Sequence, residues 1–530
     1  FSYIHRPCFY SAVLCPYIPL LWQAATEDQS GRRDGPSFTG ESVMRQTLIL
    51  ILTLAVGLSG CTMIPKYKRP EAPIPIQWPS GAAYPVTKPV IGTLEAAQLK
   101  WREFFSDPKL QKIIETALKN NRDLRLAALN VERARALYGI SRADLLPIVD
   151  AGVGGSQQQV SADIVGPMVK RTSKNYDVNL GIAAWEIDFF GRIRSLEKQA
   201  LEEYLNTEEA RRSAQISLVS SVAEAYLALA ANRENLALAE STLQSQTFSY
   251  NMVKRQYALG VANGLDLHRA QTPVEIARRD IARYTEFVAQ SQNALNLLAG
   301  SPVPEDLLPF DLAGVSPTKD ISTGLSSEVL LRRPDIMAAE HRLKGAYANI
   351  GAARAAFFPQ ISLTTTLGTA SNELSGLFKA GTSTWLYGAQ ATMPIFDART
   401  WFAYRVSKAD REIALTKYEK AIQTAFKEVA DVLAVNGTVG QQVAAQESLV
   451  VALTETYRLS NFRYTRGIDS YLGVLVAQRE LFAAQQALVL LRQEKFANRV
   501  RLYAVLGGGV EYSEAAETSV IKKFFRLFRI

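Results

Sequence analysis

Hydrophobic and polar positions follow a helical period over one long stretch of the chain, residues 192–259. Apolar residues recur three and four positions apart there, with charged residues between them; the apolar series includes Ile216, Val219, Val222, Tyr226 and Leu229. The stretch has neither proline nor glycine, and a helix of this length would extend roughly 100 Å at about 1.5 Å per residue. The pattern predicts a coiled-coil-like helix with one buried seam, and its recurring charges argue against a membrane span.

A period of two residues marks the segments before this helix, at about 148–162 and 175–188. Apolar residues alternate there with small or polar ones, which is the pattern of a half-exposed strand. A helical block at about 107–146 precedes the strands, and a turn at 260–264 and a helix at about 265–298 follow the long helix. The predicted order is therefore helix, strand, strand, long helix, turn and helix.

The same order repeats after a loop-rich insertion at 301–325. Residues 123–147 align without a gap to residues 335–359, with aspartate, glycine, Arg-Ala and proline at matching positions. The repeat continues with segments of the same kind, namely two strands at about 360–370 and 384–395 and a long helix at about 398–466. The chain is thus predicted to contain two similar halves with two strands each.

Two strands per half are too few to close a barrel within one chain. An open sheet edge cannot face lipid, and small membrane barrels have about eight strands or more. If these strands enter a membrane, the barrel must be shared between chains. Trp185 and Trp385 lie in the predicted strands, and we expect both at the lipid-facing side or rim, where membrane barrels carry aromatic belts.

Composition and charge remove several functional classes. The chain has 530 residues and a formal net charge of +8, and its basic residues are interspersed with acids, which argues against nucleic-acid binding. The cysteines are Cys8, Cys15 and Cys61, and the histidines lie far apart, so the sequence has no metal-ligand spacing. It also has no phosphate-binding loop and no nucleophile triad. We therefore predict a protein that is not an enzyme, without catalytic residues and without a metal site.

The N-terminal segment resembles a bacterial lipoprotein signal. Residues 1–43 lack a starting methionine and any periodicity, and we interpret them as a non-native or dispensable extension. Residues 44–60 contain a basic start and a short apolar run, and they end in Leu-Ser-Gly before Cys61. This pattern predicts a diacylglyceryl thioether on Cys61; the alternative is a chance cysteine after an ordinary signal peptide. Residues 61–106, rich in proline, are predicted to be an extended tether and equatorial segment.

Several motifs together resemble one family, the TolC-like outer membrane factors, in the lipoprotein branch that serves tripartite RND efflux systems (OprM/NodT-like). The resemblance covers roughly residues 61–509. The motifs are 185–192 (Trp-Glu-Ile-Asp-Phe-Phe-Gly-Arg), 330–336 (Leu-Leu-Arg-Arg-Pro-Asp-Ile), 356–359 (Ala-Phe-Phe-Pro), 464–467 (Tyr-Thr-Arg-Gly), and the helix start at 471–482.

The resemblance implies a mainly α fold with a membrane β part, as a TolC-like homotrimer. Four strands per chain would form a shared 12-stranded β-barrel, and the long helices would form a periplasmic α-barrel. Residues 107–300 and 326–509 would be the two repeats, 301–325 an equatorial insertion and 510–530 a C-terminal tail. The implied partners are a periplasmic membrane-fusion adaptor, an inner-membrane RND pump and outer-membrane lipid, with no cofactor apart from the lipid on Cys61. The protein would then lie in the outer membrane, extend into the periplasm, and conduct drugs or other small toxic compounds passively outward.

The resemblance also assigns roles at the two helix turns. Tyr257 and Gly260 in the first turn, and Tyr464 and Gly467 in the second, would form the adaptor-docking tips; the alternative for the glycines is a plain helix C-cap. Leu472 and Val476 would form the periplasmic gate, with seam packing as the alternative for Leu472. The family often has an aspartate where this chain has Val476, so we expect an apolar gate that closes by dewetting and close packing.

Two other functions remain open at this point. The same fold could serve type I protein secretion or metal-ion export, although the chain has only 6 methionines and 3 histidines. A non-pore lipoprotein coiled-coil adaptor is a different class, and the repeated strand pairs argue against it.

Overall fold

The computed structural model describes residues 62–84, 99–161, 163–164, 171–316, 318–319 and 326–509. It divides the chain into two units, Phe1–Gly60 and Cys61–Ile530, and the elements below belong to the second. The predicted extension, the signal segment, Cys61 and the C-terminal tail lie outside the described residues.

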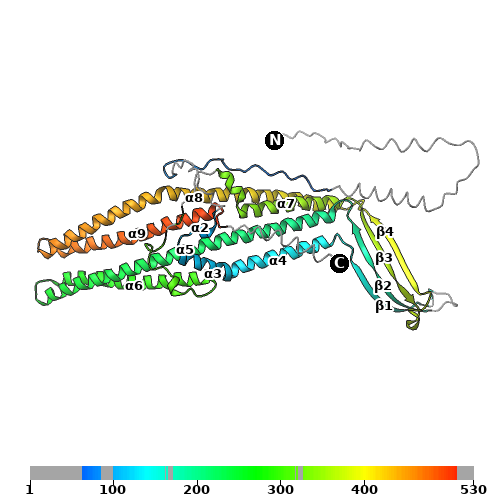
Figure 1. Cartoon of the computed structure of the whole chain (residues 1–530), viewed down its shortest axis with the longest axis horizontal. Helices are drawn as coiled ribbons and strands as arrows, with labels where there is room; N and C mark the ends of the chain where they lie inside the picture. Colours follow the sequence, from blue (N-terminus) through cyan, green and yellow to red (C-terminus); the bar gives the residue numbers. More distant parts are fainter. Residues whose placement is uncertain are drawn as a thin grey trace, which may run out of the picture. The chain divides into compact units, whose positions relative to one another are not determined.

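The described residues contain two similar series of elements (Figure 1). The first is α2 (Trp101–Phe104), α3 (Pro108–Asn120), α4 (Arg122–Ala143), β1 (Val149–Gln159), β2 (Thr172–Ile187), α5 (Arg192–Ala258) and α6 (Gly264–Ala299). Short turns η2 (Glu305–Leu307) and η3 (Ser327–Arg332) follow. The second is α7 (Pro334–Ala355), β3 (Gln360–Ser371), η4 (Leu374–Gly376), β4 (Ser383–Thr392), α8 (Ala398–Thr465) and α9 (Tyr471–Val505). The predicted strands and long helices are present, with ends within a few residues of expectation.

The predicted helical block at 107–146 is wrong in one respect, because it is two helices that meet at Asn121. The backbone of Asn121 is extended, and its Oδ1 accepts a hydrogen bond from the Leu124 N–H at 2.9 Å. Its Nδ2 donates to the Leu298 carbonyl at 3.0 Å. Asn121 is therefore an N-cap for α4 that also ties the break to the end of α6.

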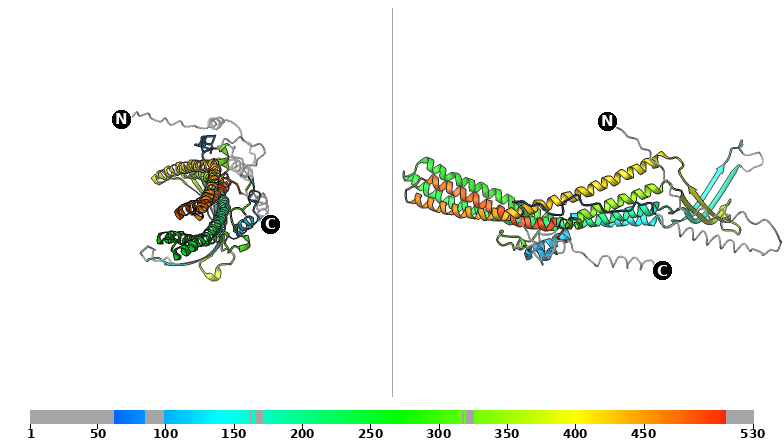
Figure 2. Two further views of the ribbon diagram at one scale, coloured as in Figure 1. Left: turned by 90° about the vertical axis from the view of Figure 1, so that its left-hand side faces the viewer. Right: turned by 90° about the horizontal axis from the view of Figure 1, so that it is seen from above.

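The helices pack in antiparallel pairs, α5 with α6 and α8 with α9, and Figure 2 shows these pairs side by side. The strands lie at one end of the helices and the α5–α6 and α8–α9 turns at the other (Figure 1). An 18-residue window of α5 has a mean hydropathy of 1.4, so the spacing of charges alone does not exclude a membrane span there. More than half of that window is buried, because α5 crosses the main hydrophobic core there.

The four strands form one antiparallel sheet in the order β1-β2-β3-β4. Directly paired residues share a face, and the registers place Val153, Val178, Leu367 and Trp385 together on one face. Trp385 is 77% exposed there. Apart from Leu386, the described residues of the opposite face are small or polar, among them Gly154, Asn175, Asp177, Asn179, Thr366 and Gln390. The sheet therefore has an apolar and a polar face, and within the described residues β1 and β4 each have one unpaired edge.

A β-bulge preserves this division where β2 approaches α5. Ile182 pairs with Thr365, and the next pair is Trp185 with Leu363. Three residue steps along β2 therefore lie opposite two steps along β3, so β2 contains one extra residue. Ala184, in the bulge, has a positive φ of 53°, and its N–H donates to the Thr364 hydroxyl at 3.2 Å. The extra residue reverses the alternation of β2, which keeps Trp185 on the apolar face.

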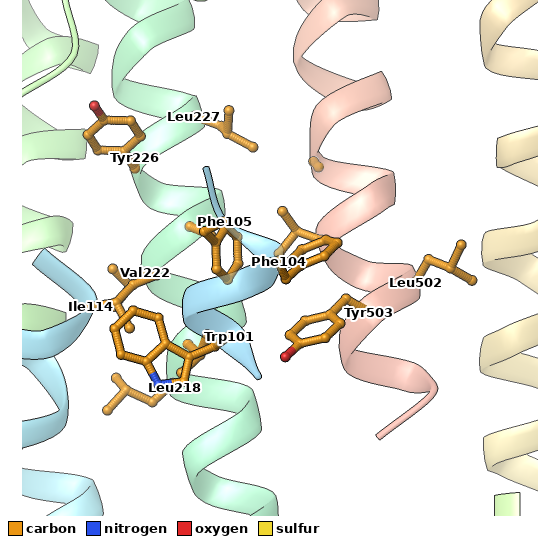
Figure 3. Close-up of a cluster of buried hydrophobic side chains, with 14 of the residues drawn as sticks. Trp101, Phe104, Phe105, Ile114, Leu218, Val222, Tyr226, Leu227, Leu502 and Tyr503 are labelled. Atoms are coloured by element: carbon orange, nitrogen blue, oxygen red, sulfur yellow. The ribbon is translucent and has the colours of Figure 1, made fainter. Parts of the chain in front are cut away.

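The hydrophobic core lies midway along the helices, where the segment 99–105 enters between α5 and α9 (Figure 3). Phe104 is fully buried, and its ring stacks on Tyr503 with centroids 4.1 Å apart. The Tyr503 hydroxyl donates to the Leu99 carbonyl at 2.5 Å. This cluster fixes α2 to the last turn of α9.

The proline-rich segment 62–84 packs on the protein, which a simple tether would not do. The Tyr67 hydroxyl donates to Glu340 of α7 at 3.0 Å, and the Trp78 ring stacks on Phe426 of α8 at 5.1 Å. Ile64 contacts Gly351 so closely that a Cβ there would be 2.5 Å from the Ile64 Cγ1 atom. The segment is therefore a strap along α7 and α8.

We predict that Gly368→Ala disrupts the sheet and that Gly388→Ala does not. A Cβ on Gly368 of β3 would be 2.2 Å from the Val178 carbonyl oxygen, whereas one on Gly388 of β4 meets nothing within 4 Å. Overpacking of this kind costs about 1–3 kcal/mol or more. The yield of folded, trypsin-resistant protein should fall several-fold for the first variant only. Equal yields for the two would contradict the described β2–β3 packing.

Candidate functional site: the helical tips and the gate

The two helix turns at the tip have the same backbone structure. In the first, the Gly260 N–H donates to the Tyr257 carbonyl at 3.0 Å and the Val261 N–H to the Gln256 carbonyl at 2.8 Å. In the second, Gly467 and Ile468 form the equivalent bonds to Tyr464 and Arg463, both at 2.9 Å. These are Schellman motifs. Both glycines have φ of 73°, so the C-cap interpretation of Gly260 and Gly467 is confirmed, and their docking role stays a prediction.

The two predicted tip tyrosines have different environments. Tyr257 of α5 is half-exposed. Tyr464 of α8 turns toward the other hairpin, where its hydroxyl donates to Gln256 Oε1 at 3.2 Å. Its ring lies 5.0 Å from that of Tyr471, the first residue of α9. Tyr464 is thus a link between the α5–α6 and α8–α9 hairpins, and Gln256 is a partner that the sequence pattern did not indicate.

A small buried cluster supports this link. Its buried members come from both hairpins and are Val253, Ala270, Tyr471 and Val474. Burial raises the pKa of Tyr471 to about 12, so its phenol stays neutral at physiological pH. The two hairpins are therefore held together at the tip by an apolar and aromatic contact and by the hydrogen bond between Tyr464 and Gln256.

The second turn is also closed by an ion pair within the chain. The Arg463 guanidinium contacts both carboxylate oxygens of Asp469, at 2.5 and 3.1 Å. This pair lowers the pKa of the Asp469 carboxyl, so the acid stays ionised. Because both groups are exposed, the pair stabilises the turn only modestly. It pairs Asp469, an acidic residue that lies three positions before Leu472.

The predicted gate residues lie one turn apart on α9, away from the buried seam. Tyr471, Val474 and Gln478 occupy the seam, whereas Leu472 is 46% exposed and Val476 37%. Leu472 is therefore outside the buried seam within one chain, and its gate role and the alternative of seam packing between copies both stay predictions. Both side chains line a cavity between α5, α6 and α9. The structure brings the two predicted gate residues together as an apolar pair on one face of the helix.

The described residues contain no group of three or more His, Cys, Asp or Glu side chains placed to hold a metal ion. The arrangement at the tip offers packing and hydrogen bonding between hairpins. It therefore suits a mechanical function, in which two hairpins hold or release each other.

Comparison with known proteins agrees with this architecture. The model of the family "Outer membrane efflux protein" matches residues 113–301 and 325–508. The chain belongs to the outer membrane efflux protein family. Two Pseudomonas putida relatives, the antibiotic efflux pump outer membrane protein ArpC and the toluene efflux pump outer membrane protein TtgC, are each 47% identical over 468 residues, or 88% of this chain and 96% of theirs. The structure of the open state of the Neisseria gonorrhoeae MtrE outer membrane channel matches with a TM-score of 0.76 and 37% identity, over 85% of this chain and 99% of that one.

The fold is therefore TolC-like, and the protein is an outer-membrane efflux channel component. This membership excludes the non-pore coiled-coil adaptor as a class.

We predict that Tyr464→Phe loosens the tip. The variant removes the hydrogen bond to Gln256, which is worth about 1 kcal/mol, or roughly fivefold in an opening equilibrium. Amide hydrogen exchange in residues 250–264 and 457–471 should accelerate by about that factor. Tyr257→Phe is the matched control at the equivalent half-exposed position of the repeat, and it should leave exchange unchanged. Equal effects of the two variants would show that the described link does not hold the hairpins.

Proposed function

We propose that the protein is the exit duct of a tripartite efflux pump, and that it conducts drugs or other small toxic compounds passively across the outer membrane. The observation that carries this proposal is a sheet with one apolar and one polar face that continues into two long helical hairpins. The apolar face is suited to contact lipid, and the polar face is suited to line a water-filled lumen. Two relatives are named as outer membrane proteins of an antibiotic and of a toluene efflux pump. These names support small molecules as the cargo, rather than metal ions or secreted proteins.

The functional unit in this proposal is a homotrimer. Within the described residues, the four strands of one chain leave one edge of β1 and one edge of β4 unpaired. Pairing β1 of one copy with β4 of the next would give every strand two hydrogen-bonded neighbours. Three copies then form a barrel of 12 strands, within the range of about 8 to 26 seen in outer-membrane barrels. A periplasmic membrane-fusion adaptor would dock at the tips carrying Tyr257, Gly260, Tyr464 and Gly467. An inner-membrane RND pump would supply the energy.

The gate in this proposal is a ring of Leu472 and Val476 from each copy. Apolar side chains that approach closely exclude water, and a narrow apolar constriction blocks ions and hydrated solutes. The half-exposed position of both residues beside the seam supports this role.

We also propose a lipid on Cys61, with the protein held in the outer membrane by both anchor and barrel. The strap gives support, because Ile64 packs against Gly351 near the end of α7, from which the chain continues into β3. A segment that starts there is well placed to reach the membrane. Cys61→Ser should abolish incorporation of radiolabelled palmitate, and persistent labelling would place the lipid elsewhere.

We predict that Leu472→Ala and Val476→Ala each raise single-channel conductance in planar bilayers, on the order of twofold, because they widen and wet the constriction. Leu490→Ala provides the control, since Leu490 is also an exposed residue of α9 but lies several turns from the tip. Unchanged conductance in both gate variants would place the constriction elsewhere.

The proposed function is tested in cells that express a matching pump and adaptor. Deletion of the gene should lower tolerance to antibiotics and toluene, and a plasmid copy should restore it. Loss of metal tolerance or of protein secretion, with drug and solvent tolerance intact, would contradict the proposal in favour of the alternatives.

A further inference from the structure

The cavity beside the two gate residues has an interior that the proposed conduction mechanism does not use. Its volume is about 270 Å³, near the lower end of the range for small-molecule sites. Pro273 and Ile276 of α6 form one wall, and Leu472, Val476 and Phe482 of α9 form another. Most of the lining is therefore aliphatic or aromatic, which suits a flat or compact apolar body.

Two buried amides give this cavity a polar floor. Gln246 of α5 is 4% exposed and Gln478 of α9 is 7% exposed, and both line the cavity. The Oε1 atom of each is buried without a hydrogen-bond partner. Buried polar atoms of this kind are normally satisfied in native structures. When one of these glutamines turns its amide toward the cavity, a bound molecule with a hydroxyl group would supply the missing donor.

The rim of the cavity carries positive charge. Arg269 and Arg479 line it, and no acidic residue is among the described residues that do. Arg269 has Asp266 at 4.0 Å. Arg479 is exposed and, within the described part of the chain, forms no ion pair. A guanidinium in this position suits a carboxylate, which it can bind through two hydrogen bonds.

We infer that this cavity is a binding site for a small amphipathic organic anion, specifically a hydroxy-substituted carboxylate with an apolar body. The carboxylate binds Arg479 at the rim, the body lies between α6 and α9, and the hydroxyl donates to a buried glutamine. A molecule bound there contacts Leu472 and Val476. The inference does not rest on the proposed conduction, because binding is measured on the purified protein.

Equilibrium dialysis of the full-length protein in lipid nanodiscs tests this site, with protein-free nanodiscs as the background. The probe is 6-hydroxy-2-naphthoate, whose hydroxyl and carboxylate lie at opposite ends of an apolar ring system. It should bind saturably, one molecule per chain. The analogue 2-naphthoate, which lacks the hydroxyl, should bind several-fold more weakly. If the assembled protein shows no saturable binding, the inference is overturned. A second copy that fills the cavity would give this result.

Paired variants locate the bound probe. Thr272 and Thr285 are exposed residues of α6 whose hydroxyls both donate to the carbonyl four residues earlier, but only Thr272 lines the cavity. Thr272→Trp should abolish binding because the indole fills the cavity, whereas Thr285→Trp should leave it unchanged. Binding that survives Thr272→Trp would refute the site even if the wild-type protein binds the probe.

A second pair tests the charge. Arg479→Gln should weaken binding of 6-hydroxy-2-naphthoate at least tenfold, and Arg492→Gln, on the same helix but outside the cavity, should not. Binding of 2-naphthol, which lacks the carboxylate, should be the same in the wild type and in Arg479→Gln. Equal loss for the charged and neutral probes would show a structural effect and refute the assignment of an anion.

Discussion

The unpaired edges of the four-stranded sheet are the constraint on which the rest of the structure depends. Backbone N–H and C=O groups cannot remain without partners in hydrocarbon. The part of one chain that the structure describes leaves a row of such groups on β1 and another on β4. Only neighbouring copies can complete both ladders while keeping one face toward lipid. The helices that follow each strand pair must then continue the same wall, because α5 and α8 begin within a few residues of β2 and β4.

The junction between strand and helix shows how this continuity is kept. The bulge at Ala184 restores the apolar face of β2 just before α5 begins. Two ion pairs then fix the turn, Arg192 with Glu186 at 2.6 Å and Arg194 with Asp188 at 3.2 Å. Both pairs are partly buried, so they are screened less than surface pairs. The direction of the helix is thus set by the strand that precedes it.

Local patterns predicted most of the fold, because strands and long helices leave a periodic signal over many residues. The helix break at Asn121 was missed, since one capping residue hardly disturbs a helical period. The packing of the strap on α7 and α8, and the contact of Tyr464 with Gln256, depend on residues more than 200 positions apart. No local pattern carries such pairings. The prediction that Leu472 and Val476 form a gate came from family resemblance, and periodicity alone would not have separated these residues from the seam.

The internal repeat explains why the two tips share a backbone structure but differ in their side-chain contacts. Position for position, Arg463, Tyr464 and Asp469 of the second hairpin correspond to Gln256, Tyr257 and Ala262 of the first. The second turn is closed by its own Arg463–Asp469 pair, whereas the first has no charges at those positions. Its Gln256 is instead free to accept the hydroxyl of Tyr464. The second hairpin is therefore braced internally and holds the first. Because the second hairpin also carries the predicted gate residues, a movement of α9 at the tip would strain both this hydrogen bond and the buried cluster beside it.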